Sequence, residues 1–295
     1  MTRRLPIAAF AASMTETLPE PEPSAAPIPR FRFLEIETRS TCNRRCAACI
    51  RNSHPSREAI QSWFEPNELP LDVIDRVMAE ARALGCATVV LSHYNEPLED
   101  LRLGSIATMA RSHGFSCVWA ATNMDLMTPE RARELDGKFD DLFVALYPTA
   151  GFPYRRPGPL LEGPEEAEER AAWLRSLFHE TRLDMRAREA DGGMHIPSHF
   201  SPIHPVDELA KKYSGYPCHE PTNRMIVNHR GDMLLCCQDV VGHFALGSVH
   251  DTSVNALWYS ARHQALVRAL SKPGGRSVHT HCTTCPQLVA GGEKY

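Results

Sequence analysis

The chain carries the run TCNRRCAAC at residues 41–49, in which Cys42, Cys46 and Cys49 are spaced C-x3-C-x2-C. A strand-like stretch, FRFLEIE at residues 31–37, directly precedes this loop. Three thiolates in one short loop can hold three irons of a [4Fe–4S] cube and leave the fourth iron open to a chelating ligand. The spacing therefore predicts a cluster with one reactive iron at the end of the first strand.

Zinc is the alternative occupant of this loop, with His54, five residues after Cys49, as the fourth ligand. Zinc loops more often pair a C-x2-C with a second pair nearby than place three cysteines in one short run. The iron–sulfur interpretation is therefore favoured.

A second group of cysteines lies near the C-terminal end. Two apolar runs, residues 225–227 and 233–235, flank the polar residues 228–232 and predict a β-hairpin in which Gly231 supplies the turn. An approximate apolar stripe over residues 253–270 predicts a helix that returns the chain to a terminal C-x2-C. The candidate ligands of a closed second site are Cys218, Cys236, Cys282 and Cys285. Taken alone, these four cysteines are also compatible with a zinc ribbon.

Together the two motifs resemble those of the radical S-adenosylmethionine (SAM) family. The second group resembles the twitch domain, the shortened form of the SPASM domain, which holds one auxiliary [4Fe–4S] cluster. The resemblance implies that SAM chelates the open iron of the first cluster and is split into methionine and a 5′-deoxyadenosyl radical. It also implies that the closed auxiliary cluster transfers electrons or places substrate. One residue departs from the family pattern, since Ala48 stands where an aromatic residue often packs on the adenine.

Between the two cysteine groups, strand-like and helical patterns alternate. Helices are predicted at residues 71–84, 101–112, 129–135 and 164–180, and strands at 87–92, 115–121, 142–147 and 183–188. Strands separated by helical crossovers form a parallel sheet. The expected fold is therefore α/β, and the resemblance implies a partial (β/α) radical SAM barrel followed by a small twitch domain.

The expected domain organisation follows from these patterns. Residues 1–30 combine a short apolar run with a tract rich in Pro, Glu and Ala, and they are predicted to be a disordered tail rather than a secretory signal. The barrel is expected at residues 31–190, a linker rich in Pro and His at 191–217, and the twitch domain at 218–295.

Candidate SAM contacts lie where parallel strands should end, because the sites of such sheets lie at the carboxyl ends of their strands. The candidates are Asn95, Glu96, Thr122, Asn123, Arg186 and Arg188. The resemblance implies that the turn with Glu96 grips the SAM amino group, although Asn95 replaces a glycine of the family. It implies that the turn with Thr122 meets the ribose, while a guanidinium on the last strand suits the carboxylate. A solvated loop residue or a structural ion pair is the alternative for each.

Composition limits the other functions. Ten cysteines in 295 residues are clustered as ligands rather than spread as a disulfide framework, which favours a reducing cytoplasm. The net charge of −4 gives no basic footprint for nucleic acid, and no run of 18 apolar residues predicts a membrane span.

The resemblance is greatest to the subgroup of aminoglycoside biosynthesis that includes 2-deoxy-scyllo-inosamine dehydrogenases. It implies an oxidoreductase that dehydrogenates a hydroxyl-bearing carbon of a small aminocyclitol or sugar-like natural-product intermediate, with flavodoxin or ferredoxin as electron donor. Three alternatives stay open: an epimerase in which Cys237 donates a hydrogen atom, a ribosomal-peptide maturase, and a non-catalytic zinc protein. Peptide-modifying relatives usually add a leader-binding element of ~80 residues. The 30 residues before the first strand are too few for one, so a small substrate is expected unless a separate partner binds the leader.

Overall fold

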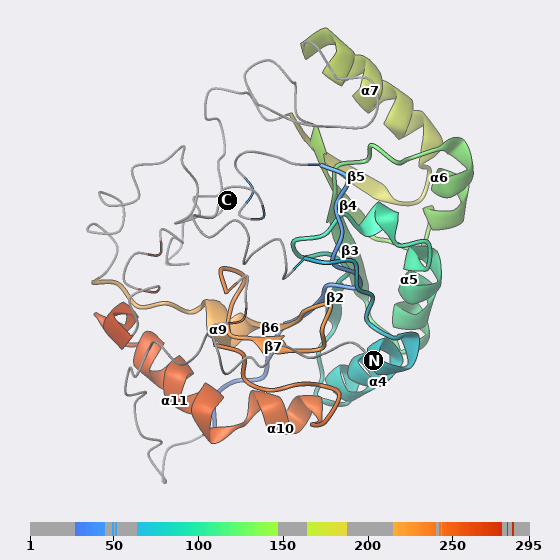
Figure 1. Cartoon of the computed structure of the whole chain (residues 1–295). Coiled ribbons are helices and arrows are strands. Elements are labelled where there is room, and N and C mark those ends of the chain that lie inside the picture. Colours follow the sequence, from blue (N-terminus) through green and yellow to red (C-terminus); the bar gives the residue numbers. More distant parts are fainter. Residues whose placement is uncertain are drawn as a thin grey trace.

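The sheet starts at β1 (Phe33–Ile36), in which buried Leu34 and Ile36 alternate with Glu35. Four more strands follow in chain order, β2 (Thr88–Val90), β3 (Cys117–Thr122), β4 (Asp141–Leu146) and β5 (Arg182–Ala187). All five are parallel neighbours in the computed structural model, each pairing with the next along the chain. The predicted parallel α/β sheet is therefore confirmed (Figure 1).

The structure describes residues 27–44, 49, 51, 64–146, 164–187, 215–239, 242, 244–278, 282 and 285. Several predictions from the sequence fall outside these residues: most of the N-terminal tail, most of the linker, and the side chains or positions of Cys46, Ala48, His54, Arg186 and Arg188.

Helices cover one face of this sheet (Figure 1). They are α4 (Leu71–Ala83), α5 (Leu103–Ser112), α6 (Pro129–Leu135) and α7 (Pro164–Leu177), close to the predicted bounds. Helix α4 buries Val73, Ile74, Val77, Met78 and Ala81, which recur at the helical period and face the sheet. Beyond its end, Gly85 adopts a φ of 86°, a left-handed conformation that glycine tolerates.

The predicted hairpin is present as β6 (Arg224–Val227) and β7 (Met233–Leu234), with Gly231 at a φ of 82° in the turn. A short helix, α9 (Glu220–Asn223), leads into it. Strand β6 also pairs in parallel with β1, so that seven strands of the described chain form one sheet in the order β5-β4-β3-β2-β1-β6-β7. The hairpin thus continues the barrel sheet, a pairing that the sequence did not indicate.

The single helix predicted over residues 253–270 is wrong, because the chain forms two helices there. They are α10 (Val254–Trp258) and α11 (Ala261–Leu270). The Ser253 hydroxyl caps α10, and Ser260 caps α11 by accepting from the amide of His263. The break lets the buried Trp258 donate its indole N–H to the carbonyl of Pro29 at 2.9 Å while α11 turns toward the C-terminal cysteines.

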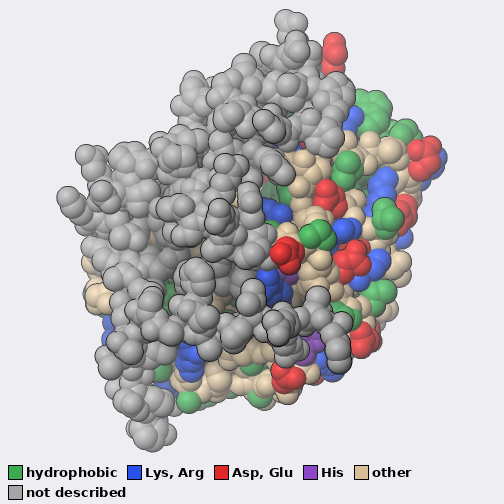
Figure 2. Space-filling view, in the orientation of Figure 1, with side chains coloured by type: hydrophobic (Ala, Val, Ile, Leu, Met, Phe, Trp, Pro, Cys, Tyr) green, Lys and Arg blue, Asp and Glu red, His purple; other side chains and the backbone are tan. Residues whose placement is uncertain are grey.

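Charged side chains of both signs are interspersed over the described part of the face in Figure 2, without a large patch of one sign. No helix among the described residues has the length and apolar character needed to cross a membrane.

Candidate active site

The face of the sheet opposite α4 to α7, called the inner face here, carries the polar and aromatic residues. Register places Glu35, Val90 and Trp119 side by side on it, because directly paired residues of a parallel sheet point the same way. Near the carboxyl ends of β3 and β4, this face carries the small side chains of Ala121 and Ala145, with Phe143 beside Ala121. Ala121 is exposed and Phe143 and Ala145 are partly exposed, so the inner face is accessible at these strand ends.

The cysteine loop is held against the turn that follows β3. The guanidinium of Arg44 donates to both carboxylate oxygens of Asp125 at 2.6 Å, and the two side chains are only 5% and 6% exposed. Asn123 donates from Nδ2 to Oδ1 of Asn43 at 2.9 Å. These contacts fix the start of the loop although its proposed ligand Cys46 lies outside the described residues.

Cys42 and Cys49 are placed at the beginning and end of this loop. Burial raises the pKa of Cys42 to about 12 and also raises the pKa of Cys49. Metal ligation requires thiolates, so cluster binding would release protons from these two groups. Arg51 ties the end of the loop to the backbone, donating to the carbonyl of Tyr94 at 2.9 Å.

Glu96, Thr122 and Asn123, predicted from separate strands, are brought together. The buried Glu96 carboxylate accepts from the Thr122 hydroxyl at 2.5 Å, the Asn123 amide at 2.8 Å and the Leu98 amide at 3.1 Å. Burial raises the pKa of Glu96 to about 7. Glu96 thus joins the turn after β2 to the turn after β3, at the place where a SAM contact is predicted.

Two buried polar atoms beside the loop fit a bound SAM molecule. Asn95 accepts from the amide of His93 at 2.9 Å through Oδ1, while its Nδ2 finds no hydrogen-bond partner among the described residues. The buried hydroxyl of Thr41 likewise has no hydrogen-bond partner among the described residues. Unmade hydrogen bonds of buried donors cost about 1–3 kcal/mol each, and the polar amino-acid and ribose groups of SAM could satisfy them. Arg186 lies in β5 opposite Ala145, but its side chain is outside the described structure.

The hairpin and α11 bring the second group of cysteines together. Burial raises the pKa of Cys236, and the nearby Cys285 and Cys218 raise it further. Burial likewise raises the pKa of Cys282 to about 12, again with contributions from Cys285 and Cys218. Several of the four predicted cysteines thus influence one another, and four thiolates are the ligand set that a closed four-iron cube requires. Among the described residues, no group of three His, Cys, Asp or Glu is arranged to hold a metal ion.

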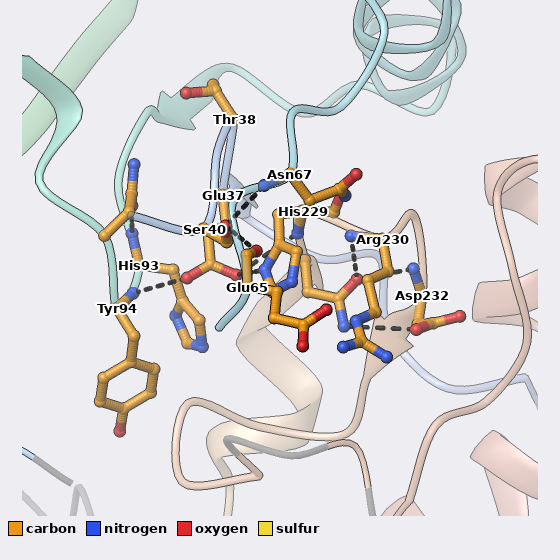
Figure 3. Close-up of polar contacts among 12 residues, drawn as sticks. Glu37, Thr38, Ser40, Glu65, Asn67, His93, Tyr94, His229, Arg230 and Asp232 are labelled. Atoms are coloured by element: carbon orange, nitrogen blue, oxygen red, sulfur yellow. Dashed lines mark hydrogen bonds and ion pairs between the residues drawn. The ribbon is translucent and has the colours of Figure 1, made fainter. Parts of the chain in front are cut away.

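A buried polar network joins the end of β1 to the hairpin (Figure 3). Glu37 pairs with Nδ1 of His229 at 2.7 Å and accepts from the amide of Tyr94 at 3.3 Å. Asn67 donates to the carbonyl of His229 at 2.6 Å, and the Tyr94 hydroxyl donates to the carbonyl of Cys237 at 2.8 Å. Sequence reasoning missed these residues, although two glutamates within the short apolar strand FLEIE were a usable signal.

A second ionic cluster lies deeper on the inner face. His93 pairs through Nδ1 with Glu35 at 2.5 Å, and Arg224 from β6 pairs with the same carboxylate. Burial alone would raise the pKa of Glu35, but His93 and Arg224 outweigh it and lower the pKa. Burial alone would lower the pKa of His93, but Glu35 outweighs it and raises the pKa. Burial raises the pKa of the nearby Cys237, whose thiol lies within reach of the charges of Glu35 and Arg224.

Residues 218–286 match the family model of SPASM, described as an iron–sulfur cluster-binding domain. This match favours iron–sulfur over a zinc ribbon at the second site. No curated protein matches the chain in sequence.

Solved structures share the fold of the chain. BtrN in complex with AdoMet and 2-DOIA has a TM-score of 0.62 at 19% identity, over 90% of this chain and 97% of BtrN. SuiB of Streptococcus suis, bound to the precursor peptide SuiA, has a TM-score of 0.56 at 13% identity, over 90% of this chain and 76% of SuiB. anSMEcpe with bound AdoMet has a TM-score of 0.55 at 13% identity, over 86% of this chain and 88% of anSMEcpe.

The expectation of an iron–sulfur cluster at the second cysteine site is supported, because the matched domain is one that binds such a cluster. The chain thus shares its fold with these solved structures, and its residues 218–286 match an iron–sulfur cluster-binding domain at the place where the second cysteine motif predicts one.

Proposed function

We propose that the chain is a radical SAM oxidoreductase that dehydrogenates a hydroxyl-bearing carbon of a small aminocyclitol or sugar-like natural-product intermediate. Cys42, Cys46 and Cys49 would hold the SAM-cleaving cluster. The auxiliary cluster would be held by Cys218, Cys236, Cys282 and Cys285. When bound, SAM and the first cluster supply a 5′-deoxyadenosyl radical that takes hydrogen from carbon.

The position of Tyr94 carries the proposal. The Tyr94 hydroxyl donates to the carbonyl of Cys237 at 2.8 Å, and the Tyr94 carbonyl accepts at 2.9 Å from Arg51, two residues after Cys49. Tyr94 therefore contacts segments next to both the cysteine loop and the second cysteine site. A substrate near Tyr94 could lose hydrogen at the first site and an electron to the second, which is what dehydrogenation requires.

A small substrate is supported by the likeness to BtrN, whose structure contains 2-DOIA. SuiB is bound to a precursor peptide, so peptide maturation with a separate leader-binding partner is the alternative. The proposal includes an electron donor of the flavodoxin or ferredoxin type. It also includes a barrel at residues 31–190, a linker at 191–217 and a twitch domain at 218–295.

Epimerisation is the second candidate, and the place of Cys237 favours it. Its carbonyl accepts from Tyr94, and its thiol lies near Glu35 and Arg224 on the inner face. The S–H bond of Cys237 is weak enough for its hydrogen atom to quench a carbon radical. The simpler account of Cys237 is a buried thiol that only packs in the interior. Epimerisation leaves the product mass unchanged and brings one solvent deuterium into carbon, while dehydrogenation gives a product two hydrogens lighter.

Anaerobic reconstitution followed by product analysis tests the proposal. The protein should hold about eight irons, as two four-iron cubes require, and should form 5′-deoxyadenosine with a reductant. Mass spectrometry with 2-DOIA, other aminocyclitols, sugars and peptides then identifies substrate and reaction. Stoichiometric zinc without iron, or no SAM cleavage by the reconstituted protein, would contradict the proposal.

A further inference from the structure

Arg276 lies in η2 (Gly275–Val278), beside the second cysteine site, and is only 1% exposed. Its Nη1 donates to the carbonyl of Cys285 at 2.8 Å. Arginine is almost never fully buried unless its charge is compensated. The sequence gives no sign of this role, because a lone arginine in a stretch of Gly, Pro and Ser is expected to be solvent-exposed.

Arg276 is held beside the terminal C-x2-C motif. The Cys285 carbonyl accepts from its guanidinium, and the Cys285 amide donates to the carbonyl of Cys282 at 3.2 Å. Val278 of the same η2 packs with Cys218 and Cys282 against one apolar cluster, so Arg276 lies next to the proposed ligands.

The surroundings strengthen this interaction. Leu235, Phe244, Leu266 and Leu270 form a buried apolar cluster against which Cys218 and Cys282 pack. Charges interact more strongly in such a medium than in water. A buried cation here therefore acts on the second site with little screening by solvent.

An acidic group with the opposite effect lies on the hairpin side. Asp239 is fully buried and accepts from the amide of Phe244 at 3.0 Å. Its amide donates to the carbonyl of Cys236 at 3.1 Å, which places it beside this proposed ligand. Arg276 and Asp239 are thus buried residues of opposite charge at the site, and each can be neutralised by a substitution of similar size.

We propose that Arg276 is a positioning residue that raises the reduction potential of the auxiliary cluster held by Cys218, Cys236, Cys282 and Cys285. A four-cysteine cluster gains negative charge on reduction, so a nearby buried cation stabilises its reduced form. This inference rests on the proposed function. In dehydrogenation the carbinol carbon loses a hydrogen atom, the hydroxyl loses a proton, and one electron passes to an acceptor, here the oxidised auxiliary cluster. A higher potential favours that transfer.

Redox titration followed by electron paramagnetic resonance tests the inference. The titration uses full-length protein in which Cys42, Cys46 and Cys49 are Ala, so that only the auxiliary cluster contributes. Arg276→Gln should lower the reduced-to-oxidised ratio at a fixed potential about tenfold, which is 59 mV for a one-electron couple. Arg276→Lys keeps the charge and should shift less, and Asp239→Asn should shift the potential upward.

Arg268→Gln is the matched control. Arg268 lies on the neighbouring α11, and its guanidinium donates to Gln264 at 2.9 Å. The potential of this variant should equal that of the parent protein. An unchanged potential in Arg276→Gln, with the cluster assembled, overturns the inference.

If Arg276→Gln assembles no cluster, the reduction potential of Asp239→Asn tests the inference instead. An unchanged or lowered potential in Asp239→Asn overturns the electrostatic account. A parent protein without iron at the second site overturns the proposed function itself, so the two failures are distinguishable.

Discussion

Replacing Asp125 by Ala should release the cysteine loop while leaving every proposed metal ligand in place. The Arg44 guanidinium makes two 2.6 Å hydrogen bonds to Asp125, and both side chains are almost fully buried. Removing one partner of a buried ion pair costs about 3–5 kcal/mol, because it leaves a buried charge uncompensated. Since a domain has about 5–15 kcal/mol of total stability, the expected loss is a large share of it.

Two measurements follow the effect of Asp125→Ala. At about 2–4 °C per kcal/mol for a large domain, the midpoint of thermal unfolding should fall by roughly 6–20 °C. Iron analysis should show loss at the first cluster with the second retained, since the pair fixes the loop and not the hairpin. The matched control is Glu130→Ala, which removes the exposed pair with Arg133 and should leave the unfolding midpoint and the iron content nearly unchanged.

A double variant checks the cause. Arg44→Met combined with Asp125→Ala removes both charges and should recover much of the stability lost by Asp125→Ala alone. Full iron at the first cluster and an unfolding midpoint within about 2 °C of wild type in Asp125→Ala would refute the claim that this pair holds the loop.

Three further outcomes are expected. In Glu96→Gln an NH2 group replaces one carboxylate oxygen, and it cannot accept from the hydroxyl and amide groups that donate to Glu96. SAM affinity measured by calorimetry should therefore fall roughly tenfold, as loss of about one hydrogen bond implies. Glu35 has a lowered pKa and His93 a raised pKa in the folded protein. Their ion pair is therefore fully formed only above the pKa that Glu35 has in the unfolded chain. It is lost as pH rises through the raised pKa of His93. The loss of thermal stability in Glu35→Gln should therefore be larger at pH 6 than at pH 9, and equal losses would contradict the pairing. Cys237→Ala should still yield a product two hydrogens lighter, whereas deuterium incorporation that depends on Cys237 would establish epimerisation.

Local patterns predicted the barrel elements well. The apolar period of α4 and the Gly231 turn are short-range signals that the structure confirms. The C-x3-C-x2-C loop and the terminal C-x2-C are also local signals, and the two metal sites that they indicate remain predictions.

Long-range pairings were not predictable in this way. Neither the β1–β6 pairing nor the Arg44–Asp125 contact has a sequence signal, since each joins segments far apart along the chain. The break before α11 was missed because the apolar stripe continues across it, although Ser260 caps the new helix and Trp258 bonds to the Pro29 carbonyl at the break. For Glu35 the strand pattern showed an alternating polar position, but only the tertiary structure shows that this position faces a buried ionic cluster.

The central claim is that the loop of Cys42, Cys46 and Cys49 binds the cluster that cleaves SAM. The most direct measurement is 5′-deoxyadenosine formation by anaerobically reconstituted wild type and by the variant with all three cysteines replaced by Ala. The account predicts 5′-deoxyadenosine from wild type and none from the variant, which should still hold about four irons at the auxiliary site. Undiminished SAM cleavage by the triple variant would contradict it.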